Sequence, residues 1–250
     1  MHRWNDPCRC GPRGGERSAV SDYRLEQAQR DARREAAPFV VFAVAADVSL
    51  AVVSSWHDWR LLTAHDWWVW LVLALPAALL AVVFGLGLGR LGMSSKHRRK
   101  VAVLLLGLLA VANLTGIGLV ILSLVRGHGG LTGAQLLASA GVVLLVNMIT
   151  FGLVFWELDS GGPINRALQK SRTAPDFQFP QDENPHLAAP GWAPELNDYL
   201  YLALTNSVAF SPTDAMPLSH RAKLVMGVES LVSAVTVLVV AARAVNILGV

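Results

Sequence analysis

The residue with the clearest capacity for chemistry is Glu229, an acid inside a long apolar segment near the end of the sequence. It is the only ionisable residue between Lys223 and Arg243. Ser233 and Thr236 follow at steps of four and three, so the three side chains share one face of a helix. An acid at membrane depth faces a bundle interior or an aqueous cavity, and it is a functional hypothesis by default. The alternative is that Glu229 pairs with a basic or amide group of a neighbouring helix and fixes the packing.

A second group of polar residues lies just before this segment. Residues 198–206 form an apolar stretch that is too short to cross a bilayer, which needs about 20 apolar residues. A half-span helix followed by irregular backbone is tolerated at membrane depth only where that backbone is buried in protein or lines water. The pattern therefore predicts a re-entrant helix and turn, and the alternative is a surface helix followed by an aqueous loop. The candidate pore residues are Thr205, Ser207, Val208, Ala209, Phe210, Ser211 and Asp214.

The order of a short aromatic helix, a polar turn, an Asp, a Pro and a full inner helix resembles the pore module of tetrameric potassium channels. In that family the carbonyl oxygens of a Thr-Val-Gly-Tyr-Gly turn replace the hydration shell of the ion. Residues 207–211 stand at this position, with Ala209 and Ser211 where the family has glycines that relieve backbone strain. The resemblance implies a cation channel, with potassium among its ions, built from four copies around one pore. The C-terminal dipole end of the short helix would favour a cation there.

The same part of the chain also resembles the C-terminal part of a bacterial family of uncharacterised inner-membrane proteins. The shared features are Asp-x-x-Tyr at 198–201, Ser-Pro-Thr-Asp at 211–214 and Ala-Arg-Ala-Val-Asn at 242–246. This resemblance implies a multi-pass protein of the bacterial inner membrane, and it supplies no mechanism.

The sequence offers no pattern for catalysis or metal binding. It contains no His-Glu-x-x-His helix, no Gly-x-Ser-x-Gly elbow and no Walker loop. Cys8 and Cys10 are the only cysteines, and two thiolates without matching ligands do not make a closed zinc site. Residues 87–92 match Gly-x-Gly-x-x-Gly, but within an apolar segment such glycines are typical of close helix contact. We therefore expect no enzymatic activity, cofactor or metal.

The composition predicts the class of protein that must position these residues. Hydrophobic residues make up 53% of the chain, the mean hydropathy is +0.44, and charges gather in blocks between apolar runs. This indicates an all-α polytopic membrane protein. The net charge of +3 comes from flanking blocks, which favours contact with lipid headgroups and disfavours nucleic acid as a partner.

The hydrophobic pattern divides the chain into four parts. Residues 1–35 are a polar N-terminal segment, predicted to be cytoplasmic, with a helix from Ser21 or Asp22 to Glu35. Residues 36–158 are a bundle of four spans, 159–196 a Pro/Gly-rich loop, and 197–250 the pore-like helix, the turn and the final span. We thus expect about five transmembrane helices plus a short re-entrant helix. The spans predicted in the bundle are 37–55, 67–88, 101–125 and 134–158.

Three polar residues inside these spans need separate interpretation. Asp47 leaves two possibilities for the first apolar segment, a span with the acid inside the bundle or a helix at the interface. Asn113 and Asn147 are predicted to be interhelical hydrogen-bond partners.

The charge pattern also predicts a topology. The basic cluster at 90–100 should be cytoplasmic, and two spans separate it from the 159–196 loop, which would then be cytoplasmic as well. Potassium channels present their pore loop from the outside, so an inverted pore, as in ionotropic glutamate receptors, would be required. The competing hypothesis is a non-conducting membrane scaffold or regulatory subunit. A small transporter would predict an internal repeat, and none is found.

Overall fold

The computed structural model describes residues 14–56, 71–72, 74–75, 77–79, 82, 95–126, 133–168, 174–211 and 214–248. The long helices in this part are α1 (Gly14–Trp56), α3 (Ser95–Arg126), α4 (Gly133–Leu158) and α8 (His220–Leu248). The shorter elements are η2 (Asp159–Gly161), α5 (Pro163–Ala167), β1 (Phe177–Gln178), α6 (Pro180–Glu183), α7 (Leu196–Ala209) and β2 (Met216–Pro217).

Four helices in the described residues are long and apolar enough to cross a membrane. They cover Tyr23–Val53, Lys100–Leu119, Leu137–Gly161 and His220–Ala242. The prediction of a mostly helical protein with several possible membrane spans is therefore confirmed, whereas a re-entrant helix is not shown. The additional span predicted at 67–88 falls mostly on residues outside the described part of the chain.

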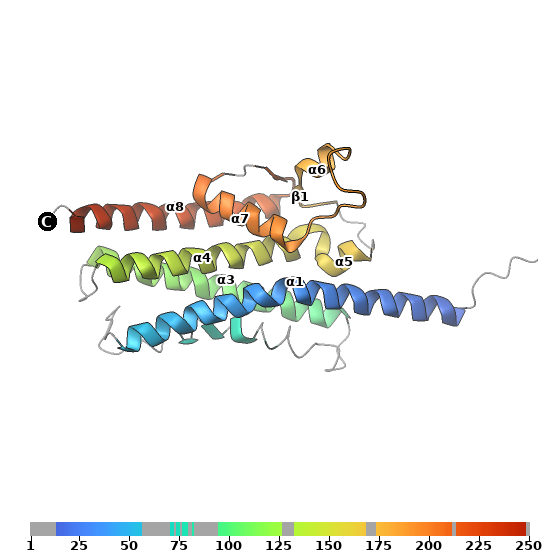
Figure 1. Cartoon of the computed structure of the whole chain (residues 1–250), viewed down its shortest axis with the longest axis horizontal. Helices are drawn as coiled ribbons and strands as arrows, with labels where there is room; N and C mark the ends of the chain where they lie inside the picture. Colours follow the sequence, from blue (N-terminus) through green and yellow to red (C-terminus); the bar gives the residue numbers. More distant parts are fainter. Residues whose placement is uncertain are drawn as a thin grey trace, which may run out of the picture.

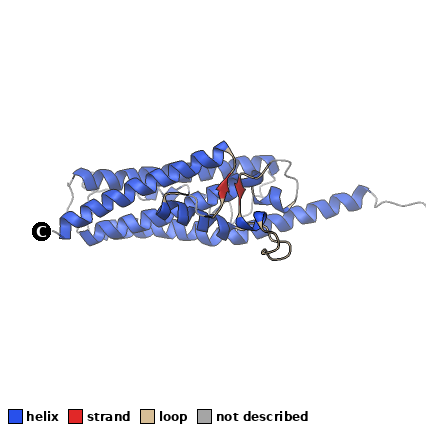
Figure 2. Ribbon diagram, turned by 90° about the horizontal axis from the view of Figure 1, so that it is seen from above, coloured by secondary structure: helices blue, strands red, loops and turns tan. Residues whose placement is uncertain are grey.

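The long helices lie side by side as an elongated bundle (Figures 1 and 2). Helix α4 contacts α1, α3, α7 and α8, so it is the central helix of the described residues. The first turn of α3, the C-terminal end of α4 and the first turn of α8 lie at the same end of the bundle (Figure 1). The basic residues that open α3 and the loop that follows α4 therefore share one end, as the count of two spans between them predicted.

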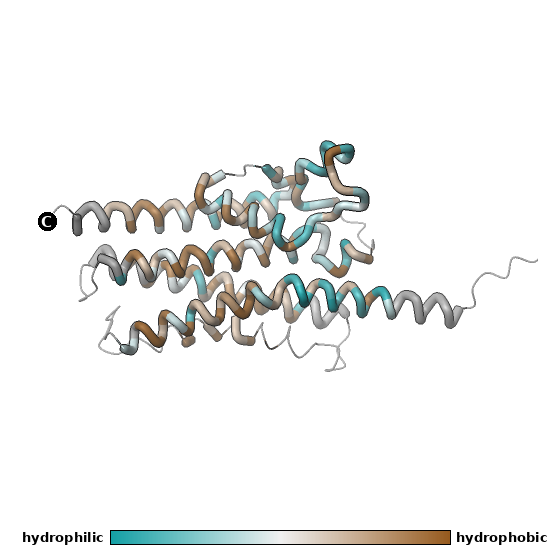
Figure 3. The backbone as a smooth tube through the Cα atoms, viewed as in Figure 1, coloured by the Kyte–Doolittle hydropathy of each residue, from teal (hydrophilic) through white to brown (hydrophobic). Residues whose placement is uncertain are grey.

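Helix α1 is longer than a membrane is thick. Its 43 residues extend for about 65 Å, whereas the hydrocarbon core of a bilayer is about 30 Å thick. The sequence predicted a helix starting near Ser21 and a separate span after it, but the structure has one helix that begins at Gly14 and continues through Pro38. Within the coloured part of α1, hydrophilic residues predominate on the N-terminal side and hydrophobic residues predominate toward the C-terminal end (Figure 3). Its packing face carries the buried residues Ala32, Ala36, Val40 and Ala43.

Helix α8 has its polar side chains inside and its apolar side chains outside. Glu229, Ser233 and Thr236 are fully buried. The opposite face exposes apolar residues at steps of three and four, namely Leu224, Val228, Leu231, Val235 and Leu238. This is the reverse of a helix on a water-soluble protein, and it is the arrangement expected where lipid surrounds the bundle.

Helix α7 is a short element packed between α4 and α8. It reaches α4 closely because Gly152 has no side chain: a Cβ atom there would lie 2.7 Å from Leu200 Cδ2 and 3.1 Å from Leu200 Cα. The backbone N–H of Leu196 donates to Glu35 Oε2 of α1 at 3.4 Å, and the N–H of Glu195 donates to Asp198 Oδ2 at 2.8 Å. The start of α7 is thus fixed to α1 and capped by its own first turn.

The C-terminal end of α7 differs from the prediction. The sequence pattern placed the end of the helix at Asn206 and an irregular turn from Ser207, but α7 continues to Ala209. Phe210 then adopts the left-handed conformation (φ 55°, ψ 23°) and ends the helix. The physical reason is that Ser207 uses its hydroxyl group in a contact with α8 from a helical position, so its polarity does not mark a turn.

Candidate functional site

Glu229 is the centre of a buried polar cluster between α7 and α8. Asn206 Nδ2 donates to Glu229 Oε2 at 2.6 Å, and the hydroxyl group of Ser207 donates to Oε1 at 3.0 Å. Ser230 donates to Asn206 Oδ1 at 2.8 Å, and Asn206 Nδ2 also donates to the carbonyl of Met226 at 3.0 Å. We call Asn206, Ser207, Glu229 and Ser230 the Glu229 cluster.

The groups that contact the Glu229 carboxylate are neutral. Both of its oxygen atoms accept hydrogen bonds from neutral donors, and within the described residues no Lys, Arg or His forms an ion pair with it. Its two donors lie in the last turn of α7, where the helix dipole adds partial negative charge. A buried carboxylate without an ionic partner costs several kcal/mol, and the two hydrogen bonds from neutral donors offset part of this cost.

A chain of amide and hydroxyl groups runs from α3 through α4 to α8. Asn113 Nδ2 donates to Asn147 Oδ1 at 2.7 Å, and Asn147 Nδ2 donates to Ser233 Oγ at 3.2 Å. The prediction that the two asparagines join neighbouring helices is confirmed. Ser233 lies one turn after Glu229, so this asparagine chain ends beside the Glu229 cluster on α8. Thr236, on the same buried face, donates to the carbonyl of Val232 at 2.7 Å.

On the other side of α7 lies a cavity of about 130 Å³ with acidic walls. Two of the predicted pore residues, Thr205 and Asp214, line it together, and Asp198 adds a second carboxylate. None of the described residues that line it is basic. These residues are Phe179, Pro180, Gln181, Asp198, Tyr201, Leu202, Thr205, Asp214 and Ala215. We call it the acidic cavity.

The remaining predicted pore residues lie at the end of α7. Val208, Ala209, Phe210 and Ser211 are all exposed. Because successive side chains of a helix point in different directions, the predicted set is divided among three places: Ser207 at Glu229, Thr205 and Asp214 at the acidic cavity, and 208–211 on the surface. The last four carbonyl groups of an α-helix have no partner within the helix, and in α7 the carbonyl of Ala209 accepts a hydrogen bond from the Ser211 hydroxyl group at 3.4 Å.

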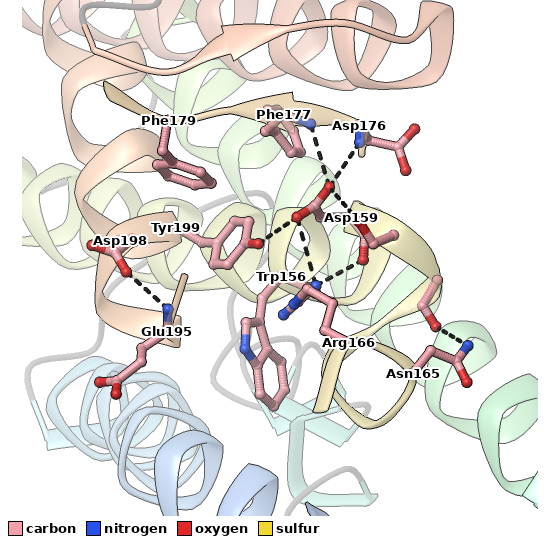
Figure 4. A network of polar contacts seen from close by, with 12 residues as sticks. Trp156, Asp159, Asn165, Arg166, Asp176, Phe177, Phe179, Glu195, Asp198 and Tyr199 are labelled. Carbon is pink, nitrogen blue, oxygen red and sulfur yellow. Dashed lines mark hydrogen bonds and ion pairs between the residues drawn. The ribbon is translucent and has the colours of Figure 1, made fainter. Parts of the chain in front are cut away.

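A second polar network, which the sequence analysis missed, surrounds Asp159 at the end of α4 (Figure 4). The hydroxyl group of Tyr199 donates to Asp159 Oδ2 at 2.6 Å, and the backbone N–H groups of Asp176 and Phe177 donate to Oδ1 at 2.7 and 3.3 Å. Arg166 lies 3.8 Å from Oδ2 and donates to the Asp159 carbonyl at 2.7 Å. We call these five residues the Asp159 cluster. It joins α4, α5, α7 and the strand β1.

The electrostatics of this cluster keep Tyr199 protonated. Burial raises the pKa of the Tyr199 phenol far above its ordinary value, Arg166 opposes this shift, and Asp159 adds to it. The guanidinium of Arg166 also lies 5.1 Å from the centre of the Tyr199 ring, a cation–π geometry. The phenol is therefore a permanent donor to Asp159 at neutral pH.

Aromatic contacts dock the loop on this network. Phe177 packs edge-on against Phe155 at 5.3 Å, and Phe179 packs edge-on against Tyr199 at 5.3 Å and against Trp192 at 6.0 Å. Strand β1 pairs with β2 in antiparallel register, Phe177 opposite Pro217, and Asp176 forms an ion pair with Arg221 at 3.3 Å. The loop thus contacts the segment between α7 and α8.

No protein-family model, curated protein or solved structure matches this chain.

Proposed function

We propose that the chain is a multi-pass membrane protein that moves monovalent cations across the bilayer, with Glu229 as the acidic group on their path. The observation that supports this most strongly is the fully buried Glu229 carboxylate, which has only neutral donors and lies beside the C-terminal end of α7. An acid inside a bundle with a hydrophobic exterior typically marks an ion or proton pathway.

The acidic cavity supplies the entrance in this proposal. Thr205 lines the cavity, and the next two residues, Asn206 and Ser207, contact Glu229. A cation attracted by Asp198 and Asp214 would therefore meet Glu229 after passing one turn of α7. The carbonyl groups of 206–208, in the last turn of α7, would replace part of its hydration shell, as carbonyl groups do in channel filters. In this proposal α7 is the re-entrant helix, and the oxygen ligands of the cation come from its C-terminal end.

Assembly and location belong to the same proposal. The resemblance to pore modules implies four copies around an axis, and the resemblance to a bacterial inner-membrane family implies the inner membrane as their location. The 159–196 loop and the basic start of α3 share one end of the bundle, so by the positive-inside rule the proposed pore is inverted and entered from the cytoplasmic side.

The second candidate is a non-conducting scaffold or regulatory subunit. The observation that favours it is the Asp159 cluster, in which every oxygen of one buried carboxylate has a partner and several elements are held together. Satisfied buried networks of this kind specify a rigid arrangement. Under this hypothesis the Glu229 cluster is also a helix-to-helix joint.

Ion flux separates the two candidates. Purified protein is placed in liposomes, and the release of Na⁺ or K⁺ down an imposed gradient is compared with release from protein-free liposomes and with chloride release. The cation proposal predicts cation release well above the protein-free level, without chloride release. Flux equal to that of protein-free liposomes under every gradient would leave the scaffold as the function.

A further inference from the structure

A second buried acid lies on a different helix from Glu229. Asp47 is in the apolar part of α1, and only 7% of its surface is exposed. Among the described residues it takes part in no hydrogen bond or ion pair. It borders a cavity of about 10 Å³ between α1, α3 and α4, lined also by Leu109, Ala112, Asn113, Gly116, Val143 and Val146.

The size of this cavity limits what it can hold. A cavity with about 10 to 15 Å³ of volume open to the centre of a water molecule can hold one water molecule, provided that this molecule has polar partners. Asp47 and Asn113 are the polar side chains in the lining. Because Asn113 Nδ2 donates to Asn147, its Oδ1 atom is left as an acceptor for such a water molecule. The site therefore fits one water molecule between a carboxyl group and an amide oxygen.

The chemistry of the lining selects a proton over a metal cation. Hard metal cations take about six oxygen ligands, whereas this lining offers one carboxyl group and one amide oxygen. Among the described residues that line the cavity, none is basic and Asp47 is the one titratable group. A proton, transferred from hydronium to a carboxylate oxygen with release of water, removes the uncompensated charge without further ligands.

We propose that Asp47 is a proton-binding site inside the membrane. Its carboxylic acid donates to one water molecule, and that water molecule donates to Asn113 Oδ1. The asparagine chain then connects the site through Asn147 to Ser233, one turn from Glu229. The proposal goes beyond the cation path because it concerns another helix, and it holds whether or not the protein carries flux.

Infrared spectroscopy of the full chain in lipid at neutral pH tests this site without reference to transport. The wild type should show the C=O stretch of a protonated carboxylic acid. This band should be lost or reduced in Asp47→Asn and should keep its Asp47 contribution in Glu229→Gln. An unchanged band in a folded Asp47→Asn protein would overturn the proposal.

A second measurement uses the wild type alone, so its result does not depend on whether a variant folds. The wild type is prepared with aspartate carrying ¹³C in its side-chain carboxyl group, which lowers the C=O frequency of Asp and leaves that of Glu unchanged. The proposal predicts a protonated band that shifts with this label. A band that does not shift, or no protonated band at all, refutes it.

Discussion

The Nδ2 atom of Asn206 lies 2.6 Å from the Oε2 atom of Glu229, and this hydrogen bond joins the last turn of α7 to α8. Both side chains are fully buried. The pair therefore holds a short helix in place and at the same time sets the surroundings of the one acid in the final span. These two consequences can be separated by experiment.

Replacing Asn206 by Leu should destabilise the protein by about 1 to 3 kcal/mol, because the Glu229 carboxylate then loses a buried donor. The double variant Asn206→Leu/Glu229→Leu should lose less stability than the sum of the two single variants, since it removes both polar partners. Urea unfolding in detergent measures all three. Asn184→Leu, at a loop amide with only a 3.4 Å local contact, is the control and should change little. Strict additivity would show that the two side chains do not interact.

Replacing Gly152 by Ala should weaken the docking of α7. The new Cβ atom would lie 3.1 Å from the Leu200 backbone, so α7 must move, and such overpacking costs about 1 to 3 kcal/mol. Gly141 is the matched control on the same helix, because a Cβ atom there meets nothing within 4 Å. Thermal unfolding of the two variants should therefore differ clearly, with Gly141→Ala at or above the wild type. Equal melting temperatures would contradict the close approach of α4 and α7.

The raised pKa of Tyr199 predicts that the protein loses stability at high pH. Its pKa is raised in the folded protein, whereas the unfolded phenol titrates near pH 10. The folded state therefore holds more protons above about pH 10, and the free energy of unfolding falls as the pH rises past that value. Tyr199→Phe should remove this part of the pH dependence and also lower stability at neutral pH, because Asp159 loses a donor.

The control for this titration is Tyr201→Phe, since Tyr201 is exposed two positions further along the same helix. It should retain the alkaline loss of stability. The measurement is urea unfolding between pH 8 and pH 11 for the three proteins. The assignment to Tyr199 fails if Tyr199→Phe and the wild type lose stability in parallel.

Water access should differ between the two sides of the α7 and α8 region. With Cys8 and Cys10 replaced, a cysteine at Thr205 should react with a small, positively charged, water-soluble thiol reagent, because it lines the acidic cavity. A cysteine at Leu231 should not react in lipid, although Leu231 is 66% exposed, because that face of α8 is apolar. Labelling in intact liposomes and again in detergent makes this comparison. Reaction at Leu231 and protection at Thr205 in lipid would reverse the assignment of the two faces.

The parts of the fold that follow from the bilayer were predictable from the sequence. Apolar runs long enough to span a membrane define the long helices, because the hydrocarbon core fixes their length. A polar side chain in such a run must find a partner, which predicted the bond between Asn113 and Asn147. The four-residue spacing of Glu229 and Ser233 likewise predicted that they lie on one face of α8.

The Asp159 cluster and the end of α7 were not predictable in this way. Asp159 finds partners 17, 18 and 40 positions further along the chain, and no local pattern encodes such distances. Ser207 was interpreted as part of a turn because its partner, Glu229, lies 22 residues away. A polar residue near a helix end is compatible with a turn or with a helix that has a polar neighbour, and only the packing of α8 distinguishes them.

The central claim is that Glu229 lies on a cation path, and cation flux through two neutralising variants tests it most directly. Glu229→Gln and Glu183→Gln remove the same charge, but Glu183 is exposed on α6. Both are reconstituted in liposomes at equal protein amount after gel filtration shows that they are folded. We expect Glu229→Gln to lower the Na⁺ or K⁺ flux at least tenfold, which corresponds to an increase of about 1.4 kcal/mol or more in the activation free energy. Glu183→Gln should leave the flux unchanged. Equal flux in the two folded variants would contradict it.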